Sequence, residues 1–172
     1  MASLVENLIS VLEQENTEYE ALLELSRKKT PVIVQGDIVR LQEITDEEQD
    51  IIDRIYNLEM KREGHVRDIA DVINRDVGEL KLENLIRILE KSPGEQKALS
   101  EVHDKLRSTL TQMQDINAQN RELLTGALEM VEFDLNLLQS VHRAPETANY
   151  NRGAYNAGSM MGSDRGRFDA KQ

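Results

Sequence analysis

Cysteine is absent from this chain of 172 residues, and so is tryptophan. Without cysteine the chain can form no disulfide, no thiolate nucleophile and no zinc site of the cysteine type. Aromatic residues amount to only 3% of the sequence, whereas charged residues amount to 31%. This composition is typical of long helices rather than of a globule with a thick core.

A basic excess is also absent, because 32 acidic residues outnumber 21 basic ones and leave a net charge of −11. An acidic surface repels phosphates, which argues against nucleic acid and anionic lipid as partners. No stretch approaches the roughly 20 apolar residues of a membrane span. The N-terminus has no basic flank and carries Glu6 early, so we expect no secretory signal, no membrane insertion and a cytoplasmic location.

Catalytic and metal-binding patterns are missing as well. His65, His103 and His142 fall on different elements or at a helix end, and none has a glutamate three residues before it. The Glu-x-x-His signature of di-iron bundles is therefore absent. The sequence contains no glycine-rich phosphate loop and no serine elbow. We expect no catalytic residue, no metal and no cofactor.

What the sequence does contain is apolar residues at helical spacing. A three- and four-residue repeat predicts a first helix over about 3–29, which Pro31 should end. Residues 31–36 are apolar and are expected to form a packed loop. Asp37 is a good N-cap for a second helix that runs to about Asn74, with Gly64 as its one interruption.

The second half predicts a short helix and then a long one. The short helix covers about 81–90. Ser92 with Pro93 and Glu95 forms a capping-box pattern that starts a last helix running to about His142. The apolar residues of this helix are spaced in near-heptads, which favours a helical partner. Asn117 and Asn120 interrupt the pattern, and buried asparagines of this kind fix register.

The predicted fold class is therefore all-α: an elongated antiparallel helical bundle made of a long hairpin, a short helix and a long last helix. The last helix, at roughly 72 Å, is longer than either helix of the hairpin. Its distal apolar residues should therefore remain uncovered and form a partner site. We refer to these eight residues as the predicted stripe: Ile116, Leu123, Leu124, Leu128, Val131, Leu135, Leu138 and Val141. Self-dimerisation is the alternative way to cover them.

The character of the chain changes after Val141. Residues 142–172 contain no Leu, Ile or Val and hold four of the nine glycines. A segment with so little to bury cannot offset its ordering entropy. We therefore divide the chain into a helical domain over 1–142 and a disordered tail over 143–172.

The order and lengths of these pieces resemble a known family. The run from Gln14 to Arg62 combines a glutamate-rich first helix, a connector ending in Gly36 and Asp37, and a second helix closing on Leu58 and Glu59. Together with the short helix and the last helix that starts at a Ser-Pro, it is similar to the FlgN flagellar export chaperones. The resemblance covers roughly residues 4–142.

The resemblance implies a cytoplasmic chaperone for the hook–filament junction proteins FlgK and FlgL. It implies that the substrate's C-terminal helical segment binds the distal last helix. It also implies delivery to the cytoplasmic domain of FlhA, the export gate, through a tyrosine of the tail, where Tyr150 and Tyr155 are the candidates. A homodimeric coiled-coil structural or adaptor protein, possible also as the free form of the chaperone, is the alternative.

Overall fold

Two long helices make up most of residues 2–73 in the computed structural model, which describes residues 2–142. Helix α1 spans Ala2–Gln35 and helix α2 spans Ile38–Ile73. A 3-10 turn, η1 (Val77–Glu79), leads to the short helix α3 (Leu82–Ile88) and a second 3-10 turn, η2 (Leu89–Lys91). Helix α4 follows over Pro93–His142. No strand occurs among the described residues, so the all-α prediction is confirmed.

The predicted end of the first helix is wrong. Pro31 lies inside α1 instead of ending it, and residues 31–35 are helical rather than a packed loop. A proline in a helix interior costs about 3 kcal/mol because it removes a donor and crowds the preceding turn. Burial of Ile33 and packing of Val32 against the hairpin core offset this cost. Val34, by contrast, is exposed.

The true end of α1 is set by Gly36. Its φ of +68° is left-handed, which favours glycine. The Gly36 N–H donates to the Ile33 carbonyl at 3.1 Å, and the Asp37 N–H donates to the Val32 carbonyl at 3.2 Å. These two bonds form a Schellman motif. Helix α2 then begins immediately, because the Asp37 side chain accepts a hydrogen bond from the Arg40 N–H, as predicted.

The other predicted boundaries are confirmed. Helix α2 ends at Ile73, with Asn74 as its left-handed C-cap, but the predicted interruption at Gly64 is wrong because α2 is continuous through that residue. Helix α4 starts at Pro93, and the Gln96 N–H donates to the Ser92 carbonyl at 3.0 Å.

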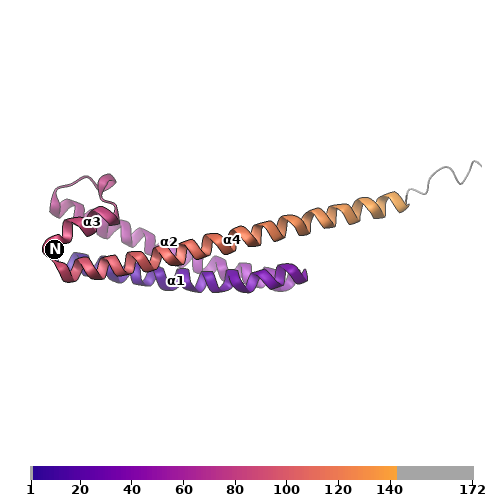
Figure 1. The fold of residues 1–172 in the computed structure, drawn as a ribbon, viewed down its shortest axis with the longest axis horizontal. Helices are drawn as coiled ribbons and strands as arrows, with labels where there is room; N and C mark the ends of the chain where they lie inside the picture. Colours follow the sequence, from indigo (N-terminus) through magenta and orange to yellow (C-terminus); the bar gives the residue numbers. More distant parts are fainter. Residues whose placement is uncertain (1, 143–172) are drawn as a thin grey trace, which may run out of the picture. The chain divides into compact units, whose positions relative to one another are not determined.

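The chain divides into two units, Met1–Leu128 and Glu129–Gln172. In the first unit, α1, α2 and the front of α4 lie side by side, with α3 near the end where α4 begins (Figure 1). Glu15 of α1 pairs with Arg62 of α2, and Lys29 of α1 pairs with Glu48 of α2. Residue numbers therefore run in opposite directions along the two helices, which are antiparallel. Asn16 and Ser26 of α1 are hydrogen-bonded to Thr109 and Asn120 of α4, respectively. Residue numbers therefore run in the same direction along α1 and α4, which are parallel. In the second unit, residues 129–142 continue α4.

Two apolar clusters form the core of the first unit. The first cluster joins all four helices and contains Val5, Leu8, Leu12, Ile69, Ala70, Leu80, Leu85, Leu89, Leu99, Val102 and Leu106. The second cluster joins α1 to α2 through Leu22, Leu25, Ile44, Ile51 and Ile55, with Met113 of α4 packed against it. The predicted three-helix arrangement is thus present.

Candidate partner-binding surface

A layer of polar side chains separates the two apolar clusters. The carboxylate of Glu15 is almost fully buried and accepts a hydrogen bond from Arg62 Nε at 2.9 Å. Burial raises the pKa of Glu15, and the neighbouring Arg62 only partly opposes that effect. Tyr19 donates to Glu59 at 3.1 Å, and burial followed by the Glu59 charge raises the pKa of Tyr19 to about 12. This layer ties α1 to α2.

The same layer ties α1 to α4. The hydroxyl of Thr109 donates to Asn16 Oδ1 at 3.0 Å, and both side chains are buried. The amide of Asn16 in turn donates to Glu20 at 2.8 Å. A buried polar group without a partner is costly, so the bond between Thr109 and Asn16 holds the two helices in one register.

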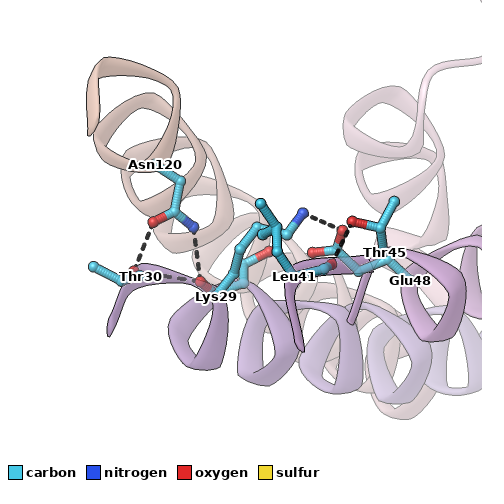
Figure 2. Close-up of polar contacts among 7 residues, drawn as sticks. Lys29, Thr30, Leu41, Thr45, Glu48 and Asn120 are labelled. Atoms are coloured by element: carbon cyan, nitrogen blue, oxygen red, sulfur yellow. Dashed lines mark hydrogen bonds and ion pairs between the residues drawn. The ribbon is translucent and has the colours of Figure 1, made fainter. Parts of the chain in front are cut away.

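A second polar layer lies beyond the second cluster and is centred on Asn120 (Figure 2). Asn120 is 4% exposed; its amide donates to the Ser26 carbonyl at 2.7 Å, and its oxygen accepts from the Thr30 hydroxyl at 2.6 Å. Lys29 pairs with Glu48 of α2 at the same level. Asn120 therefore has the buried, register-setting position predicted for it, whereas Asn117 is exposed and does not.

A groove between α2 and α4 has α1 as its floor. Two of its cavities, of about 530 Å³ and 320 Å³, are lined at the floor by Glu15, Tyr19, Leu22 and Ser26. The lining of each cavity combines side chains of a polar layer with apolar side chains, such as Leu110 in the larger cavity and Leu124 in the smaller one. Within residues 2–142 no group of three or more acidic or histidine side chains is placed to hold a metal ion.

The predicted stripe changes character along α4. In the first unit, Ile116, Leu123 and Leu124 are half-buried, and Leu128 is 65% exposed. In the second unit, every residue from 129 to 141 is exposed. The four stripe residues there are Val131, Leu135, Leu138 and Val141, with exposures between 53% and 68%. The exposed apolar surface thus begins at about Leu128.

Three exposed apolar residues of this segment were not among the predicted ones. Met130, Phe133 and Leu137 are each more than half exposed. Together with Val141 they recur at three- and four-residue steps, so they form a line of their own on the helix. The signal was present in the sequence, since 130, 133, 137 and 141 repeat in the same way as 128, 131, 135 and 138.

A second exposed apolar group lies at the tip of the α1–α2 hairpin. It consists of Val34, Ile38 and Val39, with exposures of 69%, 78% and 74%. Ile38 is the first residue of α2 and faces solvent.

The tail candidates Tyr150 and Tyr155, and the predicted tail as a whole, lie outside the described residues. Among residues 2–142, none of the helices combines the length and apolar character required to cross a bilayer. Over residues 2–142 the exposed apolar side chains lie at the hairpin tip, along α2 at Ile52, Tyr56 and Met60, at Val72 and Val77, and at the end of α4, where they are most numerous.

Comparison with protein families gives one result. The family model described as FlgN protein matches residues 1–157. No curated protein and no solved structure matches the chain.

Proposed function

The chain belongs to the FlgN family of flagellar export chaperones, and we propose that it serves the hook–filament junction proteins FlgK and FlgL. The C-terminal helical segment of the substrate binds along the end of α4. Binding covers the apolar surface of both partners and keeps the substrate soluble and unassembled. The family is one of chaperones rather than enzymes, in keeping with a role that requires binding alone.

The observation that supports this proposal is the run of exposed apolar residues from Leu128 to Val141. Fully burying one leucine side chain contributes about 1.5–3 kcal/mol. A helix that lies along several of them can therefore offset the entropy of association. An amphipathic helix is the natural partner for residues at three- and four-residue spacing.

We place delivery to the export gate in the tail. Tyr150 or Tyr155 contacts the cytoplasmic domain of FlhA, because a rigid aromatic side chain anchors a contact at low entropic cost. The location is the cytoplasm, where an export chaperone meets its substrate before export.

Co-expression with the C-terminal segments of FlgK and FlgL, followed by pull-down, tests substrate binding. The wild-type chain should retain the segments, and Leu128→Asp combined with Leu135→Asp should lose them. The matched control is Asn136→Asp combined with Gln139→Asp, which adds the same charge to exposed polar positions of the same helix. Circular dichroism should show all of these variants to be equally helical. Loss of binding in the control alone, or no binding by the wild type, would contradict the proposal.

Motility tests the role of the tail. Tyr150→Ala, Tyr155→Ala or the double variant should keep substrate binding in pull-down but assemble fewer filaments. Asn151→Ala with Asn156→Ala is the control, since it alters the residue after each tyrosine. Normal swimming of all three tyrosine variants would contradict the tail assignment.

The alternative function is that of a homodimeric coiled-coil adaptor, which the near-heptad spacing of α4 favours. The two functions differ in what covers the exposed end of α4. A tight homodimer whose mass is unchanged by a FlgK C-terminal segment would support the adaptor and exclude the chaperone.

A further inference from the structure

The exposed end of α4 carries apolar residues on far more than one face. Of the thirteen residues from 129 to 141, seven are large and apolar. At 3.6 residues per turn they cover roughly 200° of the helix circumference. A helix that packs on a single neighbour or core needs an apolar stripe of about 100°. This segment therefore has about twice the apolar width that one partner helix would cover.

The apolar residues separate into two stripes. The first stripe is Val131, Leu135 and Leu138, and the second stripe is Met130, Phe133, Leu137 and Val141. The remaining side of the helix, which we term the polar arc, consists of Glu129, Glu132, Asn136, Gln139 and Ser140. The polar arc is the side of the helix suited to face water when a partner is bound, and neither stripe lies on that side.

Asp134 is the one charged residue between the two stripes. A carboxylate enclosed by apolar side chains requires a cationic partner, because its burial alone is costly. The chain itself supplies none nearby, since no Lys or Arg occurs between Glu122 and Val141. A second copy of residues 129–141 would offer Asp134 no lysine or arginine. The charge pattern thus disfavours self-pairing and favours a partner with a basic residue on its apolar face.

From this width and this charge we propose that the end of α4 is held between two helices of the substrate at once. This inference rests on the proposed chaperone function. One substrate helix lies along the first stripe and the other along the second stripe. A lysine or arginine of the substrate reaches Asp134 between them. The recognised part of the substrate is accordingly a pair of amphipathic helices, which a single segment can supply by folding back as a helical hairpin.

Two double variants with equal spacing and equal charge change test the proposal, with FlgK and FlgL C-terminal segments as the probes. Val131→Asp with Leu135→Asp alters the first stripe, and Phe133→Asp with Leu137→Asp alters the second. Each should weaken binding at least about tenfold, as expected for loss of a buried apolar anchor. Asn136→Asp with Gln139→Asp on the polar arc should change affinity less than about threefold. Because all six side chains are exposed, circular dichroism should show no loss of helix.

The outcomes separate the inference from the function on which it rests. If only the first-stripe variant weakens binding, one helix is enough and the two-helix proposal is overturned while the chaperone function stands. If the wild type binds neither probe, both are overturned. Light scattering should give one chaperone per substrate. A complex with two chaperones that the second-stripe variant reduces to one would assign the second stripe to a second copy and overturn the proposal.

Asp134→Asn tests the charge component separately. It should weaken binding about tenfold in dilute salt and less in concentrated salt, as for a partly buried ion pair. Glu132→Gln removes the same charge from the polar arc and should have a much smaller effect. Unchanged or tighter binding by Asp134→Asn would show that no cation of the substrate reaches this carboxylate.

Discussion

Single polar side chains decide how the three long helices of the first unit are aligned. Apolar ridges between helices can slip by a turn at modest cost, whereas a buried amide has only one position in which its bonds are made. Asn16 with Thr109, and Asn120 with Ser26 and Thr30, provide such positions between α1 and α4.

Removal of the Asn120 amide should therefore be costly. Asn120→Ala leaves the Thr30 hydroxyl without its Asn120 acceptor and should lower the free energy of unfolding by about 1–2 kcal/mol. Urea unfolding measures this through the midpoint at unchanged slope. Asn117→Ala, three residues earlier and exposed, should stay within about 0.5 kcal/mol. Equal effects of the two variants would show that Asn120 has no special role.

Buried Glu15 should make stability depend on pH. Its pKa is raised above the ordinary 4.5 by burial, so the folded protein binds the proton more tightly than the unfolded chain. The contribution of Glu15 to the free energy of unfolding therefore falls as pH rises above about 4.5, and it levels off above the raised pKa. Glu15→Gln keeps an acceptor for Arg62 but does not titrate. The free energy of unfolding of Glu15→Gln, measured relative to that of the wild type, should therefore increase as pH rises from about 4.5.

Unfolding by urea at pH 4.5 to 7.5 gives that difference directly. The control is Glu13→Gln, which makes the same substitution at an exposed position of the same helix. A flat difference for Glu15→Gln would contradict the predicted direction.

The boundaries of the helices show what sequence patterns can and cannot reveal about an element. Asp37, Asn74 and Pro93 act through their own backbone and side chains, and each was predicted correctly. Pro31 was not, because its local preference against helix is outweighed by the burial of Ile33 and by the packing of Val32 against the second cluster. That packing involves a residue far along the chain, so a local pattern does not contain it. The left-handed Gly36 was the missed local signal.

The cost that α1 bears at Pro31 can be measured. Pro31→Ala restores a backbone N–H inside the helix and should raise the free energy of unfolding by about 1 kcal/mol or more. Glu24→Ala, at an exposed position of the same helix, should change it by less than about 0.5 kcal/mol. A Pro31→Ala variant that is less stable than the wild type would indicate that residue 31 is not helical in solution.

At the scale of the whole molecule, the two units differ in what stabilises them. Helix residues of the first unit are packed into two clusters and two polar layers. Residues 129–141 are exposed on all sides, and an isolated helix of this length is marginal in water. Sequence spacing predicted uncovered apolar residues from Ile116 onward, whereas Ile116, Leu123 and Leu124 are half-buried and exposure begins at about Leu128. It identified only one of two apolar stripes, because the heptad pattern was followed along a single face.

Hydrogen exchange should show this difference in the free protein. Amides of residues 129–141 should exchange much faster than those of residues 99–109, which belong to or flank the first cluster. Addition of a FlgK C-terminal segment should slow exchange over 129–141 and leave 99–109 unchanged. Equal protection of the two segments in the free protein would mean that something already covers the end of α4.

The polar arc of α4 also has a practical value for spectroscopy. Because the chain has no cysteine, a single cysteine introduced at Gln139 would be its only thiol. A fluorophore or spin label attached there would lie next to the first stripe without occupying either stripe. Substrate capture and release could then be followed in real time on an otherwise unmodified chaperone.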